Sequence, residues 1–117
     1  MKVRSRLAML TFIAVFSLPA LASSGRSYSQ SPKGATDFNA NCAMCHGPDG
    51  TGTATGKSLN APNLRSAAVQ KQSSATLARY IREGKDQMPS FKSQLTSEQI
   101  AAEVAYVRWL AHHKVSE

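Results

Sequence analysis

The sequence predicts a single all-α domain of three to four helices that closes around a group other than protein. Apolar residues recur at helical spacing in three separate stretches, as in helices with one buried face. At 117 residues the chain is long enough for one domain and too short for two. Beyond residue 22, only 13 of the remaining 95 residues are Leu, Ile, Val or Phe, which is a lean core for a folded domain. Both cysteines fall within one five-residue segment.

Residues 1–22 are typical of a secretory signal peptide. A basic start precedes an apolar run at residues 7–18, Pro19 ends the run, and Ala20 and Ala22 are the small residues that a signal peptidase requires. The basic residues are Lys2, Arg4 and Arg6. The alternative is an uncleaved membrane anchor, but a run of about 12 residues is short of the ~20 that span a bilayer. We expect cleavage after Ala22 and export to the periplasm.

Residues 23–33 are polar and rich in serine, and we interpret them as a flexible leader before a domain at residues 34–113, with a C-terminal tail at residues 114–117. No later segment approaches membrane length, so we expect no membrane insertion of the mature chain. Cleavage lowers the net charge from +7 to +4, with 11 basic and 7 acidic residues left. That modest charge, without a basic stripe interleaved with aromatic residues, argues against nucleic-acid binding.

The first predicted helix covers residues 34–42. Gly34, Phe38 and Cys42 are spaced four residues apart and therefore share one helix face. Gly34 permits close approach of another helix, and Phe38 supplies apolar bulk. We expect this face to pack across the last helix of the chain.

Residues 42–46, Cys-Ala-Met-Cys-His, have the C-x-x-C-H spacing of covalent haem attachment. Two thiols three positions apart lie on one side of a helical turn, so Cys42 and Cys45 can each add to one vinyl group of the same porphyrin. His46 then places an imidazole under the iron as the proximal axial ligand. We predict one covalently attached haem c, whose apolar surface substitutes for the missing core side chains.

Three other interpretations of these residues stay open. A redox-active dithiol also uses C-x-x-C, but usually within a βαβ pattern that this sequence lacks. A structural zinc site needs four ligands, and only His112 or His113 could complete one here. A plain disulfide is compatible with export but gives His46 no role.

The segment after His46 predicts loops. Residues 47–56 are rich in Gly and Thr, but they lack the preceding strand and the G-K-[ST] register of a phosphate-binding loop. Pro62 follows within Asn-Ala-Pro-Asn-Leu. Its carbonyl oxygen could accept the free N–H of His46 and raise the basicity of the imidazole. Equally, Pro62 could be a simple turn proline.

A further helix is predicted at Ser74–Glu83, with Leu77, Tyr80 and Ile81 facing inward. Gly84 follows directly and suits a helix stop in the αL conformation.

Iron in a c-type haem usually takes a second axial ligand, and Met88 is the methionine that remains after elimination. Two of the four methionines leave with the signal peptide, and Met44, between the cysteines, has poor reach to the other side of the haem. Pro89 biases the backbone of Met88 toward an extended conformation. Met88 could instead fill a gap in the core. His112 and His113 are rival ligands, although histidines are also favourable at the end of a helix.

The longest predicted helix opens at Thr96, whose Thr-Ser-Glu-Gln sequence is a capping box. Six residues form its apolar stripe: Ile100, Val104, Tyr106, Val107, Leu110 and Ala111. We expect this stripe to pack against the first helix. A partner-binding amphipathic helix is the alternative, but it leaves the domain with little core.

Together these residues resemble the class I cytochromes c, the small monohaem electron carriers, over residues 34–110. The motifs are Gly34-x3-Phe38-x3-Cys42-x2-Cys45-His46, Asn60-Ala61-Pro62-Asn63-Leu64, Gly84-x3-Met88-Pro89 and Val104-Ala105-Tyr106. The resemblance implies the cytochrome c fold, with crossed N- and C-terminal helices around one covalent haem. It also implies His46 and Met88 as axial ligands and a single haem edge exposed for electron exchange. The C-x-x-C-H segment and the residues after it look most like bacterial periplasmic members.

These expectations favour a monomeric one-electron carrier over an enzyme, because two protein ligands leave the iron no open site. Its redox partners would be a reductase or dehydrogenase as donor and a terminal oxidase or other reductase as acceptor, as in a respiratory chain. Scattered lysines could steer docking to acidic patches: Lys33, Lys57, Lys85 and Lys92. Two alternatives are a dedicated haem c subunit of a periplasmic dehydrogenase complex, and a haem sensor or peroxidase in which Met88 is labile.

Overall fold

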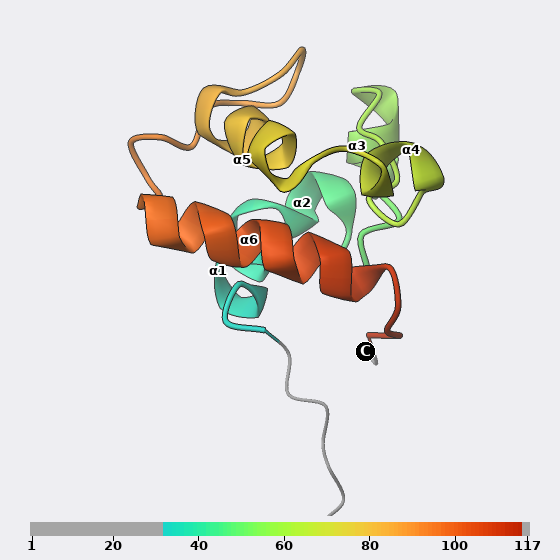
Figure 1. The fold of residues 1–117 in the computed structure, drawn as a ribbon. Helices are drawn as coiled ribbons and strands as arrows, with labels where there is room; N and C mark the ends of the chain where they lie inside the picture. Colours follow the sequence, from blue (N-terminus) through green and yellow to red (C-terminus); the bar gives the residue numbers. More distant parts are fainter. Residues whose placement is uncertain (1–31, 116–117) are drawn as a thin grey trace, which may run out of the picture.

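The computed structural model describes residues 32–115, so the predicted signal peptide, most of the predicted leader and residues 116–117 lie outside it. Six helices occur in this range, and Figure 1 shows how they are arranged: α1 (Ala35–Asn41), α2 (Ala43–His46), α3 (Ala54–Ser58), α4 (Ala67–Gln70), α5 (Ser74–Glu83) and α6 (Ser97–Leu110). Residues 32–115 contain no strand, only one isolated bridge. The all-α prediction is confirmed. None of these helices is long and apolar enough to cross a membrane.

Local sequence determines where the two longest helices begin. Helix α5 starts after Ser73, whose hydroxyl oxygen accepts the backbone N–H of Thr76 at 3.1 Å. Helix α6 starts with the predicted capping box: Thr96 accepts the Gln99 backbone N–H at 3.2 Å, and the Gln99 side chain accepts the Thr96 N–H at 2.9 Å. Each cap satisfies backbone donors that a helix start leaves without an internal partner.

Helix α6 crosses α1 at Gly34, as the sequence predicts. A β-carbon built on Gly34 would lie 2.4 Å from the carbonyl oxygen of Ala102, so only glycine permits this approach of the two backbones. One turn further along, the ring centroids of Phe38 and Tyr106 lie 5.0 Å apart. The side chain of Gln99 also donates to Asp37 at 3.0 Å, which ties the start of α6 to α1.

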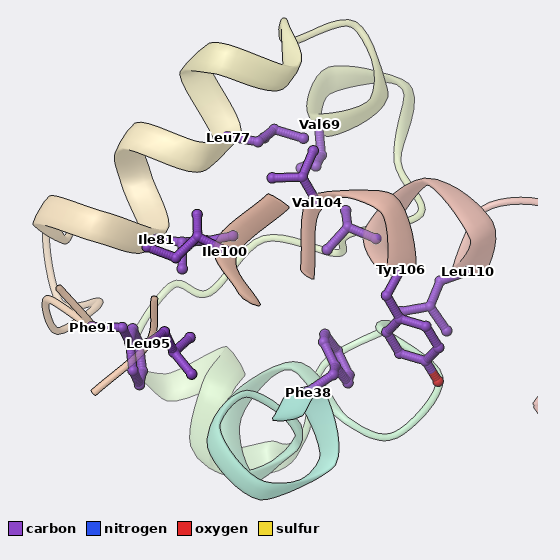
Figure 2. Packing of buried hydrophobic residues seen from close by; sticks show 11 residues of the cluster. Phe38, Val69, Leu77, Ile81, Phe91, Leu95, Ile100, Val104, Tyr106 and Leu110 are labelled. Carbon is purple, nitrogen blue, oxygen red and sulfur yellow. The ribbon is translucent and has the colours of Figure 1, made fainter. Parts of the chain in front are cut away.

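The buried apolar side chains form one cluster, and α6 contributes side chains along its whole length, from Ile100 to Leu110. In Figure 2, Leu77 and Val69 lie beside Val104, whereas Phe38 lies beside Tyr106 on the other side of the cluster. The buried members are Phe38, Val69, Leu77, Ile81, Phe91, Leu95, Ile100, Val104, Tyr106, Val107 and Leu110. The expected inward residue Tyr80 is only partly buried.

The short helices α3 and α4 were not predicted, and α2 was expected only as a helical turn, because four or five residues are too few to show a periodic pattern. One of them, α3, begins inside the stretch that was expected to be loop at residues 47–56. A β-carbon on Gly56 would lie 1.9 Å from the carbonyl oxygen of Cys45, so α3 packs directly on the backbone of α2. Helix α4 is held to α6 by Arg108, which donates to the Gln70 carbonyl at 2.9 Å and to the Gln72 carbonyl.

The expected conformation of Gly84 is wrong. Gly84 does end α5 and has a positive φ of 83°, but its ψ is 166°, so the residue is not αL. This backbone region is open almost only to glycine. The chain therefore leaves α5 extended and turns back at Lys85, rather than closing over the helix end.

Candidate functional site

A cavity of about 720 Å³ lies between the helices, and all five residues singled out from the sequence line it. Helix α2 and the residue before it contribute Cys42, Cys45 and His46. Pro62 comes from the turn segment after α3, and Met88 from the segment after α5. Residues up to 46 positions apart in sequence thus line the same cavity, whose surface is mainly apolar.

Cys42 and Cys45 are both free thiols and both half-buried. The short helix α2 places them one turn apart, with the Cys45 N–H donating to the Cys42 carbonyl at 3.1 Å. Burial, together with the nearby charges of Glu103 and Asp37, raises the pKa of Cys42 to about 12. The neutral thiol is therefore the stable form in the fold. The structure does not contain the disulfide alternative.

His46 is buried, and its Nδ1 lies 3.3 Å from the carbonyl oxygen of Pro62. Since a carbonyl can only accept, Nδ1 carries the proton, and Nε2 keeps its lone pair for a ligand. Burial lowers the pKa of His46, partly opposed by the Pro62 hydrogen bond, so the imidazole is neutral. A neutral imidazole with one nitrogen fixed by a backbone carbonyl is the arrangement found at metal-binding histidines.

Two backbone hydrogen bonds hold the Pro62 segment in place. The N–H of Ala61 donates to the Gly56 carbonyl at 2.8 Å, and the N–H of Leu64 donates to the Gly50 carbonyl at 2.8 Å. The carbonyl of Pro62 is therefore held in position by hydrogen bonds of residues before and after it in the chain.

Met88 is partly buried against the apolar cluster. Its backbone and that of Lys85 exchange two hydrogen bonds, of 2.9 and 3.1 Å, which close a tight turn with Asp86 at a φ of 52°. This turn fixes the backbone of Met88 at the edge of the cavity.

The rival ligands lie elsewhere. His113 stacks on Trp109 with ring centroids 4.3 Å apart, and its Nδ1 lies 2.8 Å from the Trp109 carbonyl oxygen. Neither His113 nor the exposed His112 lines the cavity. Within residues 32–115, no group of three or more His, Cys, Asp and Glu side chains is arranged to hold a metal ion, so the zinc alternative has no ligand set there.

Glu103 is a site residue that was not predicted from the sequence. This residue on α6 is 1% exposed, lines the cavity, and has no hydrogen-bond partner for either carboxylate oxygen among the described residues. Burial and the neighbouring charge of Asp37 raise its pKa to about 7. Its position could have been found, because it lies within the apolar stripe, three residues after Ile100 and four before Val107.

The residues present fit an iron porphyrin. The cavity is mainly apolar, like a porphyrin face, and the two thiols that line it have the sequence spacing of covalent haem attachment. An imidazole nitrogen and a thioether sulfur on the same cavity are the two ligand types common at electron-transfer haems.

Comparison with known proteins agrees with this set of residues. The family model described as "Cytochrome C oxidase, cbb3-type, subunit III" matches residues 29–107. Cytochrome c6 of Nostoc sp. is 38% identical over 106 residues, which cover 86% of this chain and 82% of that protein. This chain belongs to the class I c-type cytochromes.

Two further c-type cytochromes are similar to this one. Cbb3-type cytochrome c oxidase subunit CcoP of Cereibacter sphaeroides is 37% identical over 84 residues, which cover 68% of this chain but only 27% of that protein. The solved structure of KustC0563 c-type cytochrome superposes with a TM-score of 0.63 at 35% identity, covering 66% of this chain and 95% of that one. Being a c-type cytochrome, the chain carries covalently bound haem c and transfers electrons.

Proposed function

We propose that this cytochrome is a one-electron carrier of the periplasm, not an enzyme, and that His46 and Met88 are its two axial iron ligands. In this proposal Cys42 and Cys45 form the thioether bonds. The observation that supports it is the single cavity that these four side chains share. When bound, haem supplies the one-electron Fe(III)/Fe(II) couple.

His46 acts as a ligand through Nε2, because Nδ1 donates to the Pro62 carbonyl. This hydrogen bond fixes the tautomer and the ring orientation and makes the imidazole a stronger donor to iron. Pro62 therefore binds no iron itself and acts through His46.

Met88 acts as the second ligand through its sulfur. A thioether favours the ferrous form and so raises the reduction potential. With two protein ligands in place, the site has no room for a substrate at iron, which favours outer-sphere electron transfer over catalysis.

The redox partners dock where the cavity meets the surface. Met44 and Leu59 line the cavity and are 77% and 41% exposed, which gives an apolar rim. The exposed Lys57 lies two residues before Leu59 and brings positive charge to this rim. An acidic patch on a partner protein, such as a reductase or a terminal oxidase, complements such a surface and would speed association at low salt.

A second candidate function is a haem subunit of a larger oxidase or dehydrogenase complex. The match to the cbb3-type subunit III family and to CcoP favours it. Stable copurification of the untagged cytochrome with a catalytic subunit would support this candidate over the diffusing carrier.

Substitution of Met88 tests the ligand assignment. We expect the near-infrared band of thioether-to-ferric-iron ligation in the wild-type protein and its loss in Met88→Ala. Met44→Ala is the matched control, because Met44 is exposed. The reduced wild type should refuse carbon monoxide, and Met88→Ala should bind it. Persistence of the band in Met88→Ala would exclude Met88, and carbon monoxide binding by the wild type would favour a sensor or peroxidase.

A further inference from the structure

Glu103 is a buried ionisable group that haem attachment and iron ligation do not use. It lies on α6, beside Val104 and three residues before Tyr106, both of which belong to the buried cluster in Figure 2. Only 1% of its surface is exposed, and neither carboxylate oxygen has a hydrogen-bond partner among the described residues. A buried carboxylate without a partner is costly, so the protonated form is favoured unless a positive charge is near.

The groups around Glu103 do not supply such a charge. Burial first, and then repulsion by the carboxylate of Asp37 on α1, favour protonation of Glu103 and raise its pKa to about 7. Cys42 and Tyr106 are its other titratable neighbours, and both have raised pKa values and are neutral. The titratable groups that line the same cavity from other elements are Cys45, His46, Tyr80, and the exposed pair of Lys85 and Asp86, whose charges compensate each other at 2.6 Å.

We propose that Glu103 makes this cytochrome a proton-coupled electron carrier, binding one proton at its carboxylate when the protein gains an electron and releasing it when the electron leaves. The step balances as oxidised protein with ionised Glu103, plus one electron and one proton, giving reduced protein with neutral Glu103. The redox partner of the proposed carrier function supplies the electron, and solvent supplies the proton. The inference therefore rests on that proposed function.

The coupling follows from charge in a buried site. Glu103 lines the cavity that the haem occupies, so its ionised form is stabilised by the extra positive charge of the oxidised protein and loses that stabilisation on reduction. Reduction thus raises the proton affinity of Glu103, and by linkage protonation of Glu103 raises the reduction potential. The coupling is expected near neutral pH, because burial and the charge of Asp37 raise the pKa of Glu103 to about 7.

The reduction potential of the haem-loaded protein as a function of pH tests this proposal. We expect the wild-type potential to fall as pH rises through neutrality, approaching about 59 mV per tenfold drop in proton concentration. Glu103→Gln keeps the shape of the side chain without a titrating proton, so its potential should be flat across that range. Glu83→Gln, at an exposed position, should behave like the wild type. An unchanged slope in Glu103→Gln would overturn the proposal.

A second variant keeps the test decisive if Glu103→Gln does not bind haem. Asp37→Asn removes the charge that favours protonation of Glu103, so the fall in potential should move to lower pH. If the haem propionates alone cause the fall in potential, Asp37→Asn should show it over the same pH range as the wild type. That result would contradict the proposal. The near-infrared thioether band, recorded at each pH, separates loss of Met88 ligation from loss of proton coupling.

Discussion

Two regions border the haem cavity, and they are built differently. The His46 region, residues 42–64, folds back on itself through main-chain hydrogen bonds at several points. The Gly52 N–H donates to the His46 carbonyl at 2.7 Å, and the Thr53 N–H donates to the Cys45 carbonyl at 2.9 Å. The Thr53 hydroxyl adds a bond of 2.8 Å to the Met44 carbonyl. Gly56 brings α3 into direct contact with the same backbone.

The Met88 region, residues 84–92, is held mainly at its far end. After Met88, the Phe91 N–H donates to the Ile81 carbonyl at 3.1 Å, and the Ser90 hydroxyl donates to the Arg82 carbonyl at 2.6 Å. Before Met88, the turn is closed by its own two hydrogen bonds, and Lys85, Asp86 and Gln87 are exposed.

This difference indicates that the two proposed ligands, His46 and Met88, are held with different rigidity. The backbone of the segment around His46 is hydrogen-bonded at several points, so the imidazole cannot move without disrupting α2 and α3. Met88 lies in a turn joined to the rest at one side, which is the kind of segment that opens at low free energy. We expect perturbations of the His46 region to unfold the domain and perturbations of the Met88 region to affect only the proposed methionine ligand.

The largest effect is expected for Gly56→Ala in the His46 region. A β-carbon at this position would lie 1.9 Å from a backbone oxygen, so α3 must separate from α2. Overpacking against rigid backbone should lower the free energy of unfolding by about 3 kcal/mol or more. Denaturant unfolding of the haem-loaded protein measures this loss. Thr55→Ala, at an exposed position of the same helix, is the control. A loss below about 1 kcal/mol in Gly56→Ala would contradict the rigid contact.

Glu103, which faces the cavity that both regions line, should make stability depend on pH. Its pKa is raised from 4.5 to about 7 in the fold, so the folded protein holds this proton more tightly than the unfolded chain. The associated stability is full below pH 4.5 and is lost as pH rises through about 7, by up to about 3 kcal/mol. The free energy of unfolding of the wild type should therefore decrease as the pH is raised from 4.5 to about 7. The Glu103→Gln variant should lack this component, and parallel curves for the two proteins would refute the assignment.

The smallest effect is expected for Ser90→Ala in the Met88 region. The change removes the hydrogen bond to the Arg82 carbonyl, at a cost of about 1 kcal/mol. The near-infrared thioether band should then disappear at a lower denaturant concentration, while global unfolding moves little. Ser93→Ala, at an exposed position nearby, is the matched control. Equal shifts of the band and of global unfolding would show that the two regions open together.

Much of the fold could be predicted because its determinants are local. The capping box at Thr96 specifies the start of α6 within four residues, and the spacing of Leu77 and Ile81 specifies the buried face of α5. Gly34 and Phe38 fall on one helix face by spacing alone, and the crossing of α1 and α6 follows from that face.

The remaining features depend on contacts between distant segments. Gly56 was expected to be part of a loop because the carbonyl that it approaches belongs to Cys45, in another helix. Glu103 falls within the apolar stripe of α6, but the cavity that it lines is formed by segments distant in sequence, so spacing alone does not place it there. Gly84 was expected to be αL because most helix-ending glycines are, yet the hydrogen bonds between Lys85 and Met88 require an extended exit. The roles assigned to Cys42, Cys45, His46, Pro62 and Met88 stay predictions, although all five residues line the cavity.

The raised pKa of Cys42 has a consequence for how the protein is made. A thiol with a pKa of about 12 is almost entirely protonated at neutral pH, and the thiolate is the reactive form. Burial is the main cause, followed by the charge of Glu103, which comes near Cys42 only when α6 packs on α1. In the open chain the same cysteine regains ordinary reactivity. We therefore expect a preferred order of assembly, in which haem is joined to the chain first and α1 and α6 then close over the bond.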